Sequence, residues 1–156
     1  MPFRALITLL AGLLACLVLA GTAAGSARIA ALQVALHARG TYYGTIDGIR
    51  GPQTTRAIMR FQRRARLAVD GVAGPQTRRA LGKLGRHDIG SRVLVLGRRG
   101  WDVSALQFRL AWHGFPSGNL DGDFGLRTDA ALRRFQRWAR LFADGAAGPA
   151  TLAALR

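Results

Sequence analysis

The chain's 156 residues suffice for one ordinary domain or two very small ones, and its formal net charge is +15. Arginine supplies nearly all of the positive charge, since Lys83 is the only lysine, and this imbalance favours a polyanionic partner: nucleic acid, an anionic membrane surface or an acidic cell-wall polymer. The only cysteine, Cys16, lies in an N-terminal apolar run, so the rest of the chain can form neither a disulfide framework nor a cysteine nucleophile.

The N-terminal segment has the order of features that is typical of a secretory signal peptide. Arg4 is followed by an apolar run over residues 5–20 and by small residues over 21–27. Small groups at Thr22 and Ala24 predict cleavage after Ala24, so that residues 1–24 form the signal peptide, and Ala27 offers a second cleavage point.

Two alternatives for this segment stay open. The apolar run approaches the ~20 residues that span a bilayer, which would make it an uncleaved anchor, the one case in which a membrane would be a partner. Residues 13–16 also resemble a lipobox that ends at Cys16. Every alternative predicts an exported protein in the periplasm, the cell wall or the extracellular space.

The rest of the chain contains one unit twice, the second copy 74 positions after the first. Leu32-Gln33 of the first copy recurs as Leu106-Gln107 of the second. The other recurring pairs are Gly40 with Gly114, Asp47-Gly48 with Asp121-Gly122, Gly51 with Gly125, Thr54 with Thr128, Phe61-Gln62-Arg63 with Phe135-Gln136-Arg137, Asp70-Gly71 with Asp144-Gly145, Gly74-Pro75 with Gly148-Pro149, and Leu81 with Leu155. No gap is needed, so the sequence predicts a tandem repeat.

Each unit is predicted to form three helices. Ile29, Leu32 and Leu36 are spaced i, i+3, i+7 on one face of the first helix, which Gly40 can end. Gly51-Pro52 begins the second helix, because proline is favoured in a first turn. The residues expected to be buried in the later helices are Ala57, Ile58, Phe61, Ala65, Ala80 and Leu81, and in the second copy Leu106, Leu110, Ala131, Leu132, Phe135, Ala154 and Leu155.

Turns connect these helices at the Asp-Gly pairs, where glycine admits a positive φ and aspartate can bond to nearby backbone N–H groups. Together the elements predict an all-α fold of two tandem three-helix bundles after the signal peptide. The first bundle is expected over residues 28–84, a linker and lead-in over 85–100, and the second bundle over 101–156. Asp102 is expected to cap the first helix of the second bundle.

The ordered motifs carry a family resemblance. In the first copy they are Ala31-Leu32-Gln33, Tyr42-Tyr43-Gly44, Ile46-Asp47-Gly48, Gly51-Pro52-Gln53-Thr54, Phe61-Gln62, Val69-Asp70-Gly71 and Gly74-Pro75-Gln76-Thr77. In the second copy they include Ala105-Leu106-Gln107, Leu120-Asp121-Gly122, Phe124-Gly125, Phe135-Gln136, Asp144-Gly145 and Gly148-Pro149. The set resembles the peptidoglycan-binding domain family that accompanies many bacterial cell-wall hydrolases, and the two copies cover nearly everything after the leader.

The resemblance implies compact three-helix domains that bind the glycan–peptide mesh of the bacterial wall. The composition agrees with this, because wall polymers carry carboxylates or phosphates and arginine pairs with both through a planar fork. Two modules on one chain can add avidity. We therefore expect an exported, non-catalytic protein whose partner is peptidoglycan or another anionic cell-wall polymer.

The sequence offers no catalytic or metal-binding set, and we expect no cofactor. The aspartates at positions 47, 70, 121 and 144 each precede a turn glycine, so turn formation explains them better than a glycosidase carboxyl pair. The histidines at 37, 87 and 113 do not match the spacing of zinc ligands. A calcium loop at 119–130 is rejected, because the sixth position is not glycine and Ala130 takes the acidic twelfth position.

Aromatic rings beside arginines are the candidate ligand-binding residues, because a ring can lie against a sugar while a guanidinium holds a carboxylate. In the first copy these candidates are Tyr42, Tyr43, Asp47, Arg50 and Arg56, and in the second copy they are Phe115, Asp121, Asp123, Arg127 and Trp138. Dense arginines on the second helix of each copy (Arg60, Arg63, Arg64 and Arg66; Arg133, Arg134, Arg137 and Arg140) usually indicate a solvated face, although the net charge makes polyanion contact plausible.

Two rival functions remain at this point. The modules could bind a separate cell-wall hydrolase and act as its targeting or regulatory subunit. A basic three-helix unit could also place its second helix in a DNA groove, but export would remove it from the chromosome, so we expect no nucleic acid partner.

Overall fold

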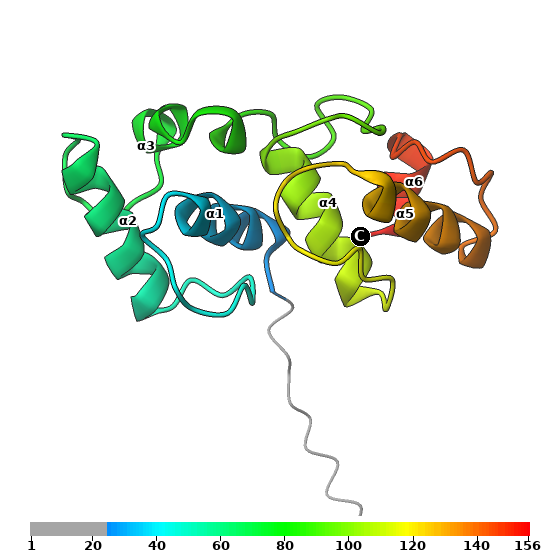
Figure 1. The fold of residues 1–156 in the computed structure, drawn as a ribbon, viewed down its shortest axis with the longest axis horizontal. Coiled ribbons are helices and arrows are strands. Elements are labelled where there is room, and N and C mark those ends of the chain that lie inside the picture. The colour runs from blue at the N-terminus through cyan, green and yellow to red at the C-terminus, as the bar shows by residue number, and fades with distance from the viewer. Residues whose placement is uncertain (1–24) are drawn as a thin grey trace, which may run out of the picture.

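The computed structural model describes residues 25–156, so the expectations about the signal peptide and Cys16 lie outside the described residues. The prediction of an all-α fold is confirmed (Figure 1). The elements are α1 (Ala27–Ala38), α2 (Pro52–Arg64), α3 (Pro75–Ala80), the 3-10 helix η1 (Gly82–Gly85), α4 (Trp101–Trp112), α5 (Leu126–Trp138) and α6 (Pro149–Ala154). Among these described helices, none is long and apolar enough to cross a membrane.

The two repeats form two similar helical modules, each with two longer helices and a short third one. Gly51 and Gly74 occupy the N-cap positions of α2 and α3, and a proline takes the first helical position after each of them. The glycines of all four Asp-Gly pairs have positive φ, between 70° at Gly71 and 75° at Gly122. The turns predicted at these pairs are therefore confirmed, since such φ values favour glycine.

Each module has its own buried core. The first contains Ala31, Leu32, Leu36, Tyr42, Ala57, Ile58, Phe61 and Leu81, and the second contains Leu94, Val103, Leu106, Leu110, Phe124, Ala131, Leu132, Phe135, Leu152 and Leu155. The predicted burial of Ala80 and Ala154 is wrong, because both are exposed. The short helices instead bury a threonine of the first turn and the leucine that follows the last turn.

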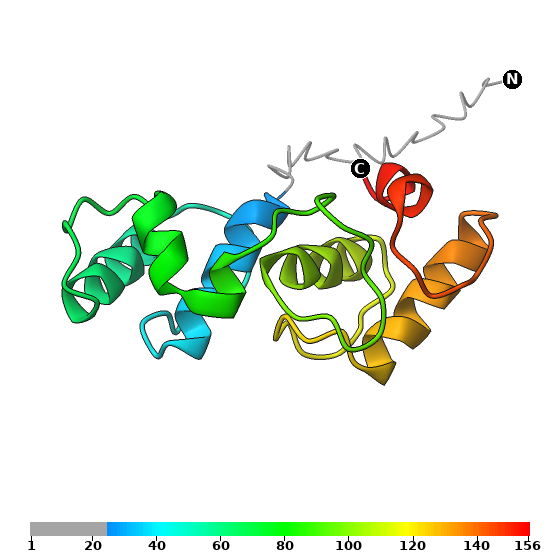
Figure 2. The same cartoon turned by 90° about the horizontal axis from the view of Figure 1, so that it is seen from above.

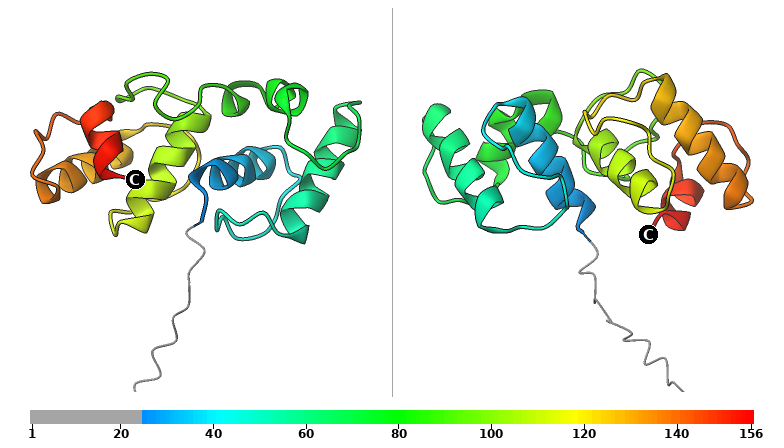
Figure 3. Two further views of the ribbon diagram at one scale, coloured as in Figure 1. Left: turned by 180° about the vertical axis from the view of Figure 1, so that it is seen from behind. Right: turned by 60° about the horizontal axis from the view of Figure 1, so that its bottom comes forward.

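The modules lie end to end, with α1 and α4 side by side in the middle (Figures 1, 2 and 3). Trp101 and Ala105 of α4 belong to the core of the first module, so the second module completes the packing of the first. The guanidinium of Arg78 lies 4.5 Å from the centroid of the Trp101 ring, a cation–π contact across the junction. The two modules are therefore packed together at α1 and α4.

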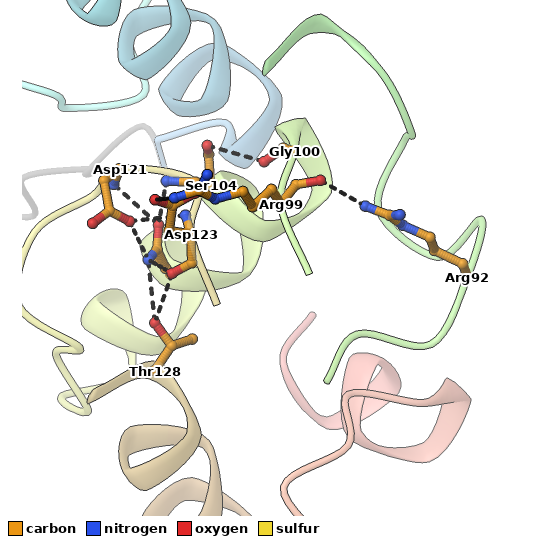
Figure 4. Close-up of polar contacts among 9 residues, drawn as sticks. Arg92, Arg99, Gly100, Ser104, Asp121, Asp123 and Thr128 are labelled. Atoms are coloured by element: carbon orange, nitrogen blue, oxygen red, sulfur yellow. Dashed lines mark hydrogen bonds and ion pairs between the residues drawn. The ribbon is translucent and has the colours of Figure 1, made fainter. Parts of the chain in front are cut away.

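Asp102 has a different role from the cap that the sequence predicted. Gly100 is the N-cap of α4, and Asp102 lies inside the first turn, fully buried. Its carboxylate accepts bonds from Arg92 Nε at 2.7 Å and Nη2 at 3.1 Å. Arg92 also donates to the Arg99 carbonyl at 2.9 Å (Figure 4). The aspartate is thus half of a buried ion pair that ties the linker to α4.

Four buried glutamines connect the helices of the modules in the same way. Gln33 on α1 donates from Nε2 to Asp47 Oδ1 at 2.7 Å and to Thr54 Oγ1 at 3.2 Å, and its Oε1 accepts the Gly48 N–H at 2.9 Å. We call this arrangement, in which one amide joins an Asp-Gly turn to the threonine in the next helix, a glutamine clasp. The other clasps are Gln62 with Asp70, Gly71 and Thr77; Gln107 with Asp121, Gly122 and Thr128 (Figure 4); and Gln136 with Asp144, Gly145 and Thr151.

Replacing a clasp glutamine should destabilise the fold much more than replacing an exposed one. Gln33→Ala removes the amide that donates to Asp47 and to Thr54 and leaves the buried Gly48 N–H without its acceptor, which costs about 3 kcal/mol. We expect the melting temperature to fall by roughly 10 °C in thermal denaturation followed by circular dichroism. The control is Gln76→Ala on the exposed face of α3, for which we expect a change near zero. Equal melting temperatures for the two variants would contradict the importance of the clasp.

Candidate ligand-binding grooves

The first module has a surface groove between the loop after α1 and the first turns of α2. This groove, groove 1, has a volume of about 260 Å³ and is lined by Tyr42, Tyr43, Gly44, Gln53, Arg56 and Arg60. A Cβ atom at Gly44 would lie 2.5 Å from Gln53 Oε1, so the absence of a side chain lets the loop approach the helix. The close approach of the loop backbone at Gly44 to α2 therefore shapes the groove, in addition to its polar side chains.

The second module has a groove at the same place. This groove, groove 2, has a volume of about 500 Å³ and is lined by Pro116, Ser117, Gly118, Arg127, Asp129, Ala130, Arg133, Arg134 and Arg137. Every residue that lines groove 1 corresponds, 74 positions later, to a residue that lines groove 2. The repeat in the sequence thus becomes a repeat of one concave surface.

An arginine of the second helix holds the loop beside each groove. Arg60 donates from Nε at 3.1 Å and from Nη2 at 2.7 Å to the Thr41 carbonyl, and Arg134 donates from Nη2 to the Pro116 carbonyl at 3.2 Å. A guanidinium has five N–H donors, and the bonds to these carbonyls use only one or two of them, so the other donors stay available. These residues therefore both position the loops and place positive charge at the grooves.

Of the candidates in the first copy, the structure brings Tyr43 and Arg56 together in groove 1. The Tyr43 ring is 76% exposed, and its hydroxyl donates to the Gly40 carbonyl, which fixes the ring at the rim. Arg56 is exposed on α2. An exposed ring fixed beside a guanidinium can contact a sugar face and an acidic group of the same ligand.

Tyr42 lines the floor of groove 1 but is buried. Its hydroxyl donates to the Thr45 carbonyl at 2.6 Å and accepts from Gln33 at 3.1 Å. Burial raises the pKa of Tyr42 above its ordinary value of 10.0, although a hydrogen bond with Thr54 opposes this. The phenol is therefore neutral and serves to support the loop.

Asp47 and Arg50 lie outside groove 1. Asp47 Oδ1 accepts the Ile49 N–H at 2.8 Å in addition to its clasp bond. Arg50 donates from Nη2 to the Gly71 carbonyl at 3.0 Å and so connects the two Asp-Gly turns of the module. The sequence placed Arg50 beside the tyrosines because it is near them in the chain, but its long side chain extends the other way.

Arg127 is the one candidate of the second copy that lines groove 2. Asp121 takes part in the clasp of Gln107, and Asp123 forms an ion pair with Arg99, whose Nη2 lies 2.6 Å from Oδ2 (Figure 4). Phe115 and Trp138 instead form an aromatic cluster with Phe135, with ring centroids between 5.6 and 5.9 Å apart. Trp138 is the last residue of α5, the helix that lines groove 2, and its ring is 65% exposed to solvent.

The lining contains residues that were not among the candidates. They are Gly44, Gln53, Arg60, Pro116, Ser117, Gly118, Asp129, Ala130, Arg133, Arg134 and Arg137. Gln53, Arg56 and Arg60 are spaced i, i+3, i+7, which is one face of a helix, and positions 127, 130, 134 and 137 follow the same rule. This spacing could have separated the groove-facing arginines from the rest of the arginine run.

Comparison with known families matches the model described as "Putative peptidoglycan binding domain" to residues 25–81 and to residues 99–155. The two matched stretches make up well over half of the chain. This protein belongs to that family. The expected resemblance and the tandem arrangement are both confirmed.

Curated relatives match one module at a time. A stretch of 56 residues is 52% identical to the N-acetylmuramoyl-L-alanine amidase CwlM of Mycobacterium tuberculosis and covers 36% of this chain and 14% of that protein. A stretch of 61 residues is 46% identical to the spore cortex-lytic enzyme of Bacillus cereus and covers 39% of this chain and 24% of that enzyme. The chain thus spans less than a quarter of the length of these relatives.

A third relative is the zinc D-Ala-D-Ala carboxypeptidase of Streptomyces albus G, 46% identical over 65 residues, or 39% of this chain and 25% of that enzyme. Among solved structures, the crystal structure of the SleB N-terminal domain is 43% identical, with a TM-score of 0.42, and the match covers 44% of this chain and 93% of that one.

The described residues, 25–156, contain no group of three or more histidine, cysteine or acidic side chains that could hold a metal ion. The aspartates of the turns are engaged in backbone and amide hydrogen bonds. The pKa of Asp70 lies below its ordinary value of 3.8, mainly because its carboxylate accepts the Val72 N–H and secondly because it accepts the Gln62 amide. The pKa of Asp144 is lowered in the same way by the Ala146 N–H and the Gln136 amide. These carboxylates stay ionised as turn acceptors, whereas a general acid needs a raised pKa.

The lowered pKa values predict a loss of stability in acid. Ionised Asp70 and Asp144 contribute stability that is fully present above the unfolded value near 3.8 and is lost as the pH falls through the lower folded values. We expect the melting temperature to be constant from about pH 7 to 5 and to fall below about pH 4. The double variant D70N/D144N keeps an acceptor oxygen in each turn, but its amides do not titrate. Its melting temperature should therefore fall less than that of the wild type below about pH 4. An equal drop in both proteins would contradict this account.

Proposed function

We propose that this protein is exported, does not catalyse a reaction, and binds peptidoglycan through grooves 1 and 2. The observation that carries the proposal is the recurrence of one groove at equivalent positions of both modules, within a chain that belongs to a family described as binding peptidoglycan. The relatives that it resembles include wall-active enzymes, and only a module-sized part of each is matched. This supports a role for the shared module in binding.

The chemistry of the two grooves fits different parts of an anionic glycan. Groove 1 has an exposed tyrosine ring with an amide and two guanidinium groups, which suits a sugar that carries an acidic substituent. Groove 2 has no aromatic ring in its lining but four arginines and the single acid Asp129, which pairs with Arg133 at 2.8 Å. Groove 2 therefore suits a more negatively charged segment.

Binding is tested by co-sedimentation of the exported protein with purified sacculi across a salt series. We expect the wild-type protein to sediment, and the variants Tyr43→Ala and R127Q/R137Q each to raise the apparent dissociation constant about tenfold, because stacking and charge-assisted bonds are lost. Arg98→Gln is the matched control, since this exposed linker arginine lies outside both grooves.

The outcomes separate the proposal from its rivals. Retention at high salt supports specific contacts, whereas full release would reduce binding to charge attraction. Protein that stays in the supernatant at low ionic strength would contradict the proposal, and so would equal binding to double-stranded DNA. If sedimentation needs a second envelope protein, the role of a targeting or regulatory subunit for a cell-wall hydrolase is favoured instead.

The N-terminus of the mature protein gives a test of export. The Ser26 N–H donates to the Gly48 carbonyl at 2.9 Å, and a Cβ atom at Gly25 would lie 2.9 Å from the Phe108 ring, so residues 25 and 26 are part of the packed fold. Cleavage after Ala24 keeps these contacts, while cleavage after Ala27 would remove them. We therefore expect the intact mass of the exported protein to correspond to a start at Gly25. A start at Arg28, or an uncut chain in the membrane fraction, would contradict this prediction.

A further inference from the structure

The second module has hollows away from grooves 1 and 2, along the seam where α4 meets α6, the linker and the start of α1. One hollow has a volume of about 340 Å³ and the other about 550 Å³. Ile89, Arg109 and Arg156 line both hollows, so we treat the two as one seam cavity. Figure 2 shows the end of α6 returning toward the start of α1 beside this seam.

Arg109 lines both hollows of the seam cavity and lies in an unfavourable setting. Its side chain is half-buried, and no ion pair or side-chain hydrogen bond found within residues 25–156 includes it. Burial lowers the pKa of Arg109, and the like charge of Arg156 lowers it further. A guanidinium that has lost water without gaining an acceptor costs free energy, which a bound anion would recover.

The fold does not need an arginine at this position. The equivalent residue of the first module is Ala35, which is fully buried in α1. Alanine also favours a helix at least as well as arginine does. The arginine is thus a feature of the second module alone, and packing does not explain it.

The other charged groups around the seam cavity leave it positive. The lining contains Arg28, Arg92 and His113 in addition to Arg109 and Arg156, and it contains no acidic side chain. The Asp102 carboxylate holds Arg92, and Asp88 lies 3.6 Å from Arg28. Arg109 and Arg156 are therefore the cations best placed to receive an anion.

The remaining walls are apolar. Ile89, Pro149 and Leu152 line one hollow, and Phe108 and Trp112 line the other, with their rings stacked at a centroid distance of 6.0 Å. Such walls favour a monoanion on a hydrocarbon chain over phosphate, which carries more charge and loses more hydration on entry.

We propose that the seam cavity is a binding site for a carboxylate carried on a short apolar chain, with the carboxylate on Arg109 and the chain against the apolar walls. Two parallel N–H···O bonds from one guanidinium would fix the carboxylate, and Arg156 would add attraction. This site is separate from grooves 1 and 2, so it does not depend on their function.

The experiment uses valerate as the probe and follows tryptophan fluorescence and melting temperature of the exported protein. We expect a saturable fluorescence change, absent in Trp112→Phe, and an upward shift of the melting temperature. Arg109→Ala should weaken valerate binding at least tenfold, while Arg98→Gln, the matched exposed arginine, should leave it unchanged. Tyr43→Ala in groove 1 should respond to valerate as the wild type does.

The same variants show whether Arg109 has only a structural role. Without valerate, Arg109→Ala should melt at or above the wild-type temperature, because an unpaired, half-buried charge is removed. A fall of several degrees, or an unchanged affinity for valerate, would overturn the proposal. Equal binding of 1-pentanol would show that the cavity is apolar only, and equal or tighter binding of inorganic phosphate would overturn the preference for a carboxylate.

Discussion

The glutamine clasp is the interaction on which the architecture depends. A primary amide can donate and accept at once, so one buried side chain satisfies both the carboxylate of an Asp-Gly turn and its backbone N–H groups. In all four clasps the aspartate precedes the threonine by seven residues, and the glutamine comes from the preceding helix. Each module therefore contains two such units in succession, each made of a helix, an Asp-Gly turn and the first turn of the next helix. The buried amide of each clasp fixes where the next helix begins.

This arrangement lets the grooves differ without loss of the fold. The clasp residues of α2 and α5 are buried, whereas the groove residues of these two helices lie on their more exposed sides. Tyr43 and Arg56 of the first module can thus correspond to Ser117 and Ala130 of the second at little cost in stability. The clasps that position the grooves are the same in both modules, whereas the residues that line the grooves differ.

Much of the fold could be predicted from the chain, because the repeat, the Asp-Gly turns and the Gly-Pro helix starts are local signals. The errors involve contacts between distant segments. Asp102 has the local position of a cap, but its carboxylate pairs with Arg92 of the linker, and Arg50 donates to the Gly71 carbonyl; no local spacing reveals either contact. Only four of the fifteen groove-lining residues, Tyr42, Tyr43, Arg56 and Arg127, were among the candidates, because position on a helix face was needed in addition to residue type.

The packing of α4 against α1 has a consequence for multivalent binding. Because Trp101 of the second module is buried in the first core, the two modules are not joined by a free linker. Two sites at a fixed separation gain avidity only on a polymer whose repeat matches that separation, whereas a flexible pair tolerates many spacings. For the peptidoglycan binding that we propose, the burial of Trp101 in the first core therefore makes the spacing of grooves 1 and 2 a determinant of specificity, alongside the residues that line them.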